Sequence, residues 1–141
     1  NAPAAVALIR KLWESTGAEV VEMSVERHDA VLAATSHLPH ALAYTLVDAL
    51  SSLPDSDEVF RCAAGGFRDF TRIASSDPTM WRDIALANRP ALLEAIDQFS
   101  QHLEQLRVAV ERKDGDELFA TFNRAKKARD AFAAVLAERT K

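Results

Sequence analysis

The side chains best suited to bind a ligand gather in a stretch that runs from Gly65 to Trp81. This stretch holds two of the chain's four glycines, two phenylalanines, and the arginines Arg68 and Arg72. Adjacent glycines allow a positive φ or a close approach of the backbone to another group. The residues after them predict a short helix with both arginines on one face. If the guanidinium of Arg72 turns inward, it can bind a carboxylate through two parallel hydrogen bonds.

A plainer interpretation of the same stretch has to be weighed. Arg68 and Arg72 could form a solvated face with Asp69 as the local partner, and composition alone leaves both interpretations open. The next helix is expected to begin with Asp77 as N-cap and a proline at its first position, which places Trp81 on its first turn. A tryptophan in such a place is more often a packing residue than a ligand contact, and the closeness of Trp81 to the arginines raises the second possibility.

A second polar group surrounds Pro39. It consists of three imidazoles and one carboxylate: His28, Asp29, His37 and His40. Imidazole and carboxylate suit zinc or iron, but this spacing matches no standard site, so we predict no metal. Hydrogen-bonded histidines are the commoner role. Because Pro39 removes a helical hydrogen bond, we expect a kink or break over 36–40 that turns polar atoms toward a ligand.

Two kinds of site are not indicated by the sequence. The glycines form neither G-x-G-x-x-G nor a G-K-[ST] loop, so no nucleotide site is visible in this chain and any cofactor must be bound elsewhere. Ser36, His37 and Asp29 are too generic a set to count as a catalytic triad.

Composition limits the class of protein. The chain has 141 residues, 48% of them hydrophobic, and its four glycines and five prolines leave few turns, so we predict a mainly α domain. A net charge of −4 argues against a nucleic-acid partner and an anionic membrane surface. The single cysteine, Cys62, excludes an internal disulfide and makes the cytoplasm the expected location. No segment is apolar enough to predict a membrane span.

The first 23 residues read differently from the rest. Ala4 to Thr16 is expected to be a helix that ends at Gly17, and the β-branched run within Ala18–Met23 predicts the one convincing strand. One strand cannot pair its own backbone. Either a partner chain pairs with it, or helix and strand are the tail of an α/β domain cut off upstream. The start at Asn1, without a methionine, favours the second interpretation.

The remaining segments read as helices. Ser24 is the expected N-cap of a helix over 25–36, and the helix after Pro39 is apolar on nearly every face, which predicts burial all round. Spacings of four and three from Leu92 to Val110 predict a heptad seam, and a second helix repeats it up to the C-terminus. We expect an antiparallel hairpin, with Gly115 in the turn and Asp116 as the N-cap.

Four motifs occur in a fixed order along the chain. They are His28-Asp29, Ser36-His37-Leu38-Pro39-His40-Ala41, Gly65-Gly66-Phe67-Arg68-Asp69-Phe70-Thr71-Arg72-Ile73-Ala74, and Asp77-Pro78 with Met80-Trp81. Together with the hairpin they resemble the C-terminal region of prephenate dehydrogenases and their arogenate (cyclohexadienyl) relatives. Each motif alone is weak, but four in register from Ser24 to Asn88 are specific.

The resemblance implies an architecture. In that family an N-terminal Rossmann domain binds NAD or NADP and carries the catalytic histidine, and a helical domain of 6-phosphogluconate-dehydrogenase-like type forms the dimer and closes the substrate pocket. Residues 1–23 would then be the tail of the nucleotide-binding domain, and 24–141 the dimerisation and substrate-pocket domain. The interface is expected to be of obligate size, above roughly 2,000 Å².

The resemblance also implies roles for four residues. Arg72 matches an arginine that binds a substrate carboxylate, His40 a histidine of the pocket, Gly65 a glycine that reaches the neighbouring subunit's pocket, and Trp81 a tryptophan near the substrate. No catalytic, cofactor-binding or metal-binding residue is implied within this chain. The reaction implied is NAD(P)-dependent oxidative decarboxylation of prephenate to 4-hydroxyphenylpyruvate, or of arogenate to tyrosine, in tyrosine biosynthesis.

Several points stay open at this stage. Because the dinucleotide fingerprint and the catalytic histidine's motif are missing, we expect no turnover by this chain alone. NAD against NADP, prephenate against arogenate, and inhibition by tyrosine are undecided. The main alternative is a helical dimerisation or tyrosine-sensing module without chemistry. The helical domain of a hydroxy-acid dehydrogenase is disfavoured by the arginine motif.

Overall fold

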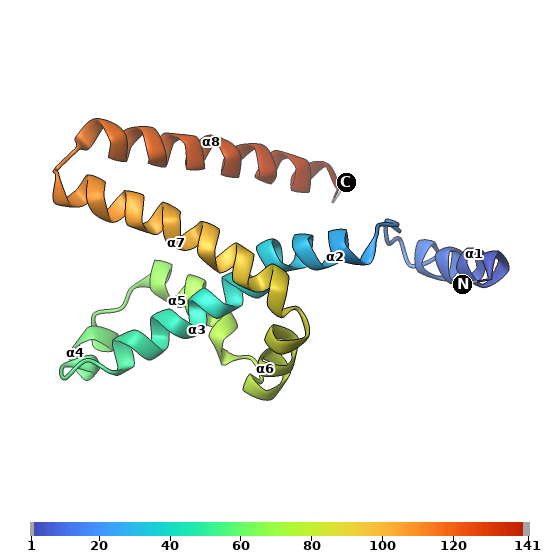
Figure 1. Ribbon diagram of the computed structural model, residues 1–141, viewed down its shortest axis with the longest axis horizontal. Helices are drawn as coiled ribbons and strands as arrows, with labels where there is room; N and C mark the ends of the chain where they lie inside the picture. Colours follow the sequence, from blue (N-terminus) through green and yellow to red (C-terminus); the bar gives the residue numbers. More distant parts are fainter. Residues whose placement is uncertain (1, 140–141) are drawn as a thin grey trace. The chain divides into compact units, whose positions relative to one another are not determined.

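The computed structural model describes residues 2–139, and every regular element in that part of the chain is a helix (Figure 1). The predicted mainly α class is confirmed. Contacts divide the chain into two units, one up to Leu92 and one from Leu93 onward. The first unit contains the candidate site, and the second is a helical hairpin.

The N-terminal segment has a helix but no strand. Helix α1 (Pro3–Glu14) is followed by Gly17 with φ 84°, as its predicted place at the helix end requires. The strand predicted within 18–23 is wrong: residues 18–24 are irregular. A β-branched run forms a strand only beside another strand, and residues 2–139 contain none. Arg10 fastens the segment instead, through its ion pair with Glu22 and a bond to the carbonyl of Val20.

Three elements then form one continuous helical run. Helix α2 (Val25–Leu32) passes into a π-helical turn, η1 (Ala33–His37), and then into α3 (Leu38–Ser51). Ser24 caps α2 by accepting a hydrogen bond from the N–H of Arg27, as predicted. Of the kink or break predicted over 36–40, the break is wrong, because the wider π turn lets Leu38 keep helical dihedrals and bond to the carbonyl five residues back.

Four shorter elements follow α3. These are α4 (Ser56–Arg61), α5 (Gly65–Thr71), the 3₁₀ turn η2 (Arg72–Ser75) and α6 (Pro78–Ala87). Helix α3 packs against α4, α5 and η2. Asp77 caps α6 through the N–H groups of Thr79 and Met80, and Pro78 takes the first position, both as predicted. Trp81 therefore lies on the first turn of α6.

The second unit is the predicted helical hairpin. Helix α7 (Arg89–Glu111), whose first residues belong to the first unit, is followed by α8 (Gly115–Arg139), which runs back beside it (Figure 1). The predicted turn chemistry is wrong by two residues. Lys113, with φ 54°, takes the left-handed position, and Asp114 caps α8 by accepting from the N–H of Glu117. Asp114 is the last residue outside the helix, so its carboxylate reaches the free N–H groups.

Few side chains in the described part of the chain are deeply buried. The buried apolar residues are Ala33, Ala43, Leu92 and Ala109, and none of the large side chains is fully covered. The burial predicted all round α3 is not met within this chain, since only Ala43 of that helix is buried. The heptad seam is also incomplete, because Leu103 and Phe122 are 52% and 57% exposed.

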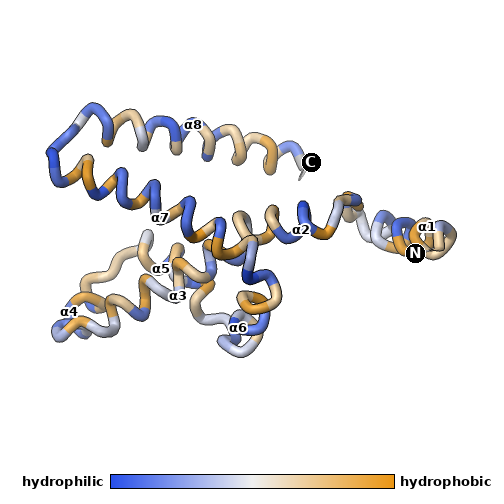
Figure 2. The backbone as a smooth tube through the Cα atoms, in the orientation of Figure 1, coloured by the Kyte–Doolittle hydropathy of each residue, from blue (hydrophilic) through white to orange (hydrophobic). Residues whose placement is uncertain are grey.

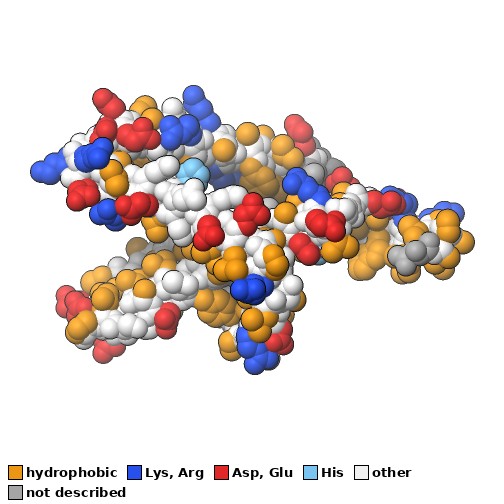
Figure 3. Space-filling model, viewed as in Figure 1, with side chains coloured by type: hydrophobic (Ala, Val, Ile, Leu, Met, Phe, Trp, Pro, Cys, Tyr) orange, Lys and Arg blue, Asp and Glu red, His pale blue; other side chains and the backbone are white. Residues whose placement is uncertain are grey.

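Much apolar surface is therefore left open. Figure 2 shows apolar residues recurring along α1, α7 and α8, and Figure 3 shows apolar side chains at the surface around α1 and around α3 and α4. None of the helices in residues 2–139 combines the length and the apolarity that a membrane crossing needs.

Candidate functional site

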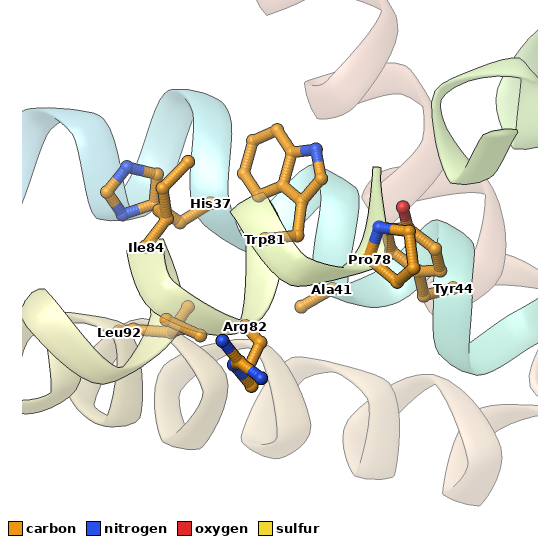
Figure 4. Close-up of a pocket in the computed structure, with 9 residues that line it drawn as sticks. His37, Ala41, Tyr44, Pro78, Trp81, Arg82, Ile84 and Leu92 are labelled. Carbon is orange, nitrogen blue, oxygen red and sulfur yellow. The ribbon is translucent and has the colours of Figure 1, made fainter. Parts of the chain in front are cut away.

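An apolar cavity of about 250 Å³ lies within the first unit (Figure 4). The end of η1, α3, α6 and the start of α7 enclose it. Its lining residues are His37, Ala41, Tyr44, Pro78, Trp81, Arg82, Ile84, Ala85 and Leu92. A cavity mainly of aromatic and aliphatic side chains with a few polar groups at its edge is typical of a small-molecule site.

The wall of this cavity carries a stacked ring pair. The imidazole of His40, on α3, lies on the indole of Trp81, on α6, with ring centroids 3.6 Å apart and planes inclined by 18°. Nδ1 of His40 lies 2.8 Å from the carbonyl oxygen of Ser36, one turn earlier. A carbonyl only accepts, so Nδ1 carries the proton and Nε2 of the neutral ring is an acceptor. The indole Nε1 of Trp81 is buried without a hydrogen-bond partner.

His37 meets the same indole edge-on, with centroids 6.3 Å apart and planes at 73°. Its Nδ1 lies 3.1 Å from Nδ2 of Asn88, and that Nδ2 also donates to the carbonyl of Asp29 at 2.8 Å. Asn88 is buried, 7% exposed, at the junction of α6 and α7. This one amide therefore links α2, η1 and the start of α7 around the cavity.

Burial lowers the pKa of His37 below its ordinary value. Asp29 opposes this shift by favouring the imidazolium, and the imidazoles of His28 and His40 add to it. His28 itself contacts the Asp29 carboxylate through Nδ1 at 3.0 Å. Burial therefore disfavours the charged form of the His37 ring beside the cavity.

The two arginines differ in their partners. Arg68 is exposed and pairs with Asp69 at 3.3 Å, as the plainer interpretation expected. Arg72 is also exposed, and no ion pair or hydrogen bond of its guanidinium is found within residues 2–139. It begins η2, which packs on α3, and the far end of η2 is tied to α3 by the Tyr44 hydroxyl, which donates to the Ser76 carbonyl at 2.6 Å.

The paired glycines show no local need for glycine. Gly65 and Gly66 start α5 without a positive φ, and a Cβ added at either would meet no atom within 4 Å. The positive φ offered by the sequence interpretation is thus absent. The other expectation was that another group lies close to the glycine backbone, and no described part of this chain does so.

No group of three metal-ligating side chains comes together within residues 2–139. Chemically, the cavity offers an apolar, ring-sized space. The imidazole of His37 and the guanidinium of Arg82 lie at its edge, and the imidazole of His40 stacks on Trp81 in its wall.

Comparison with known proteins identifies the family. Residues 24–124 match the family described as prephenate dehydrogenase, dimerization domain. The chain belongs to the prephenate/arogenate dehydrogenase family. It is 46% identical over 127 residues to a cyclohexadienyl dehydrogenase of Zymomonas mobilis, and 43% identical over 130 residues to a prephenate dehydrogenase of Bacillus subtilis. These alignments cover 89% of this chain but 43% and 34% of the relatives.

Solved structures agree with this assignment. The prephenate dehydrogenase from A. aeolicus, in complex with hydroxyphenyl propionate and NAD+, aligns with a TM-score of 0.83 and 43% identity, over 90% of this chain and 45% of that one. An arogenate dehydrogenase of Synechocystis aligns with a TM-score of 0.82 and 28% identity, over 92% of this chain and 48% of that one. The chain thus spans less than half the length of the relatives it matches.

For a member of this family, the predicted site residues are only partly assembled within one chain. The structure stacks His40 on Trp81, which lines the cavity, whereas His40 itself, Gly65 and Arg72 lie outside the lining. No role was predicted for His37 from the sequence, and Asn88 and Tyr44 were not predicted to belong to the site. Asn88 was visible only as a polar residue between two helices, and its partners lie 51 and 59 residues away.

Proposed function

We propose that this chain is the helical part of an NAD(P)-dependent prephenate or arogenate dehydrogenase and that it supplies substrate-pocket residues and the homodimer interface. The reaction is the oxidative decarboxylation of prephenate to 4-hydroxyphenylpyruvate, or of arogenate to tyrosine. Residues 1–23 would belong to a preceding nucleotide-binding domain and 24–141 to the helical domain.

The observation that carries the proposal is the stack of His40 on Trp81 against an apolar cavity. A cyclohexadienyl ring is flat, apolar and of a size that about 250 Å³ admits. His40 and Trp81 are two of the four residues to which the family resemblance gives a role at the substrate pocket. Their contact gives that assignment a physical basis, because the stacked rings hold each other in one orientation.

Arg72 would supply the charge that a dianionic substrate needs. Its guanidinium is exposed and has no ion pair within residues 2–139, so no local carboxylate competes with a ligand. A fork of N–H donors binds a carboxylate in a defined orientation, which a flexible point charge does not. Because Arg72 does not line the cavity of this chain, the proposed pocket is completed by other parts of the assembled enzyme.

The cofactor does not fit this chain by itself. Dinucleotides bind at the carboxyl ends of parallel strands, beside a glycine-rich turn, and residues 2–139 hold neither feature. In the proposed enzyme the nicotinamide accepts the hydride, and it is bound by the preceding domain. The residues described above bind and orient the substrate and exclude water from it.

The exposed surface supports a homodimer. The chain exposes 11286 Å², whereas a folded monomer of 15.5 kDa is expected to expose about 7,200 Å². The exposed apolar side chains include Leu103, Phe119, Phe122 and Phe132 on the hairpin. Burying such surface between two copies gives an interface of obligate type, above roughly 2,000 Å².

The function is tested on the intact polypeptide that includes the sequence upstream of Asn1. We expect NADH or NADPH production with prephenate or arogenate, and a G-x-G-x-x-G turn after a strand in the upstream sequence. Tyrosine binding without turnover of either substrate would contradict the proposal and support the sensing module. The 141-residue chain alone, mixed with prephenate and NAD, serves as the negative control.

A further inference from the structure

The polar contacts of His37 differ from those of the other imidazole at the cavity. His40 donates to a main-chain carbonyl, so the backbone determines which of its ring nitrogens carries the proton. The Nδ1 of His37 faces a side-chain amide, that of Asn88, at 3.1 Å. The protonation pattern of the His37 ring is therefore set by a side chain that a substitution can change.

The orientation of the Asn88 amide follows from its other contact. One of its terminal atoms lies 2.8 Å from the carbonyl oxygen of Asp29, which can only accept a hydrogen bond. That atom must be Nδ2, because an oxygen there would place two acceptors against each other. The same Nδ2 faces His37, and an NH₂ group has a second hydrogen to donate. Nδ1 of His37 is consequently an acceptor, and its proton is on Nε2.

We propose that Asn88 is a positioning residue that holds His37 neutral with its proton on Nε2, so that His37 presents an N–H donor to a ligand in the cavity. The two imidazoles beside Trp81 then have opposite characters: Nε2 of His37 donates, and Nε2 of neutral His40 accepts. The ligand group that faces His37 is an acceptor, such as a carboxylate or carbonyl oxygen. This last step rests on the proposed function, whereas the state of His37 does not.

Several charged or titratable groups surround His37, and Asn88 acts among them. Asp29 and His28 face it from α2, His40 from α3, and Arg82 lines the same cavity from α6. The Asp29 carboxylate favours a charged ring. A charged His37 would point an Nδ1–H at the donor Nδ2, so the amide opposes that charging directly.

The test is nitrogen NMR on the full chain labelled with ¹⁵N-histidine, with His37→Gln used to assign the His37 signals. In the wild type we expect a bare Nδ1 and a protonated Nε2. Asn88→Asp puts an acceptor in place of the donor, and a nearby carboxylate should raise the titration midpoint of His37 by about one to three pH units and protonate Nδ1. Asn123→Asp, the same exchange on α8, is the matched control and should leave His37 unchanged.

Asn88 also ties helices together, so Asn88→Asp could fail to fold. Circular dichroism checks this, and Asn88→Ala gives a second route: loss of the donor should raise the midpoint of His37 relative to the wild type. A protonated Nδ1 in the wild type would overturn the inference. So would midpoints that both Asn88 variants leave unchanged.

Kinetics of the intact enzyme separate this inference from the proposed function. Asn88→Asp should lower kcat/KM and shift the acid limb of its pH profile, and Asn123→Asp should do neither. If the intact protein turns over neither substrate, the proposed function fails while the NMR result stands. If the intact protein is active and the Asn88 substitutions leave the titration midpoint of His37 unchanged, the inference fails and the proposed function stands.

Discussion

The imidazole of His40 lies flat on the indole of Trp81, with centroids 3.6 Å apart and an angle of 18° between the planes. The pair joins α3 to α6, and Nδ1 of His40 is held by the carbonyl of Ser36 at 2.8 Å. One face of each ring is thereby used for packing. Nδ1 is occupied as well, so Nε2 is the ring nitrogen of His40 that is left to bind a ligand.

This geometry predicts that substitutions of His40 can change ligand binding without changing the packing of α3 on α6. His40→Phe keeps an aromatic ring on Trp81, so the free energy of unfolding should change little, whereas His40→Ala should cost about 1 kcal/mol. Both variants of the intact enzyme should lose catalytic efficiency, because neither offers Nε2. Thermal melting and steady-state kinetics on the same preparations test this. Normal efficiency in a folded His40→Phe enzyme would remove His40 from the binding site.

Arg72→Ala should leave stability intact and reduce activity. Since Arg72 is exposed and has no ion pair in the described part of the chain, its loss should change the free energy of unfolding by less than about 1 kcal/mol. Loss of a paired carboxylate contact should cost about 3–5 kcal/mol, or two to four decades in kcat/KM. Lysine should restore only part of it.

The matched control is Arg68→Ala, which removes an exposed arginine that already pairs with Asp69. We expect near-normal kinetics from it. If instead Arg72→Ala is folded and efficient toward both prephenate and arogenate, the substrate anchor would move to Arg68.

Gly65→Ala should have opposite effects on stability and activity. Nothing in the described chain lies within 4 Å of a Cβ at Gly65 or Gly66, and both start a helix, so alanine should stabilise the isolated chain by up to about 1 kcal/mol. If Gly65 reaches a neighbouring pocket, Gly65→Ala should raise Tm and lower kcat/KM. Gly66→Ala should raise Tm alone. Equal kinetics for the two variants would show that Gly65 has no special place.

The free energy of unfolding should fall in mild acid because His37 becomes protonated. Burial lowers the pKa of His37 in the folded chain, so the unfolded chain binds the proton first as the pH drops below about 6.5. The contribution is fully present above that pH and is lost as the pH falls toward the lowered pKa. Urea midpoints at pH 7.5 and 5.5 should differ less in His37→Gln than in the wild type. His102→Gln, on the exposed face of α7, is the control, and an equal effect of both variants would refute the assignment.

Phe122→Asp should weaken self-association. Phe122 is 57% exposed on α8, and a charge placed in a dimer interface costs several kcal/mol when it is left unpaired. Sedimentation velocity at micromolar concentration should show a dimer for the wild type and a shift toward monomer for the variant. Lys127→Asp, at another exposed position of α8, should sediment like the wild type. A monomeric wild type would count against the proposed interface.

Local signals in the sequence predicted local structure well. Ser24 and Asp77 cap α2 and α6 because a short side-chain oxygen beside free N–H groups bonds to them in any context. Gly17 takes a positive φ for an equally local reason. The strand within 18–23 failed because strand formation depends on a neighbour that the sequence of one segment does not contain.

The site was predictable only in part. Only the family resemblance placed both His40 and Trp81 at the pocket. No spacing rule links positions on two helices that the chain joins through three other elements. Asn88 escaped notice because its hydrogen bonds join residues 51 and 59 positions apart. Pro39 was interpreted as the cause of a kink or break because the π turn before it, which accommodates the ring, has no signature in composition.

That π turn also fixes how α2 and α3 are rotated about their common axis. A π turn accommodates one residue more than an α turn, and each residue of an α-helix advances the side chains by about 100°. Deleting one residue from Ala33–His37 would restore a regular α-helix and rotate α2 by about that angle relative to α3. The carbonyl of Asp29 would then face away from Asn88, while every residue outside the deletion kept its identity. In this segment the number of residues therefore constrains variation as strongly as their chemical type.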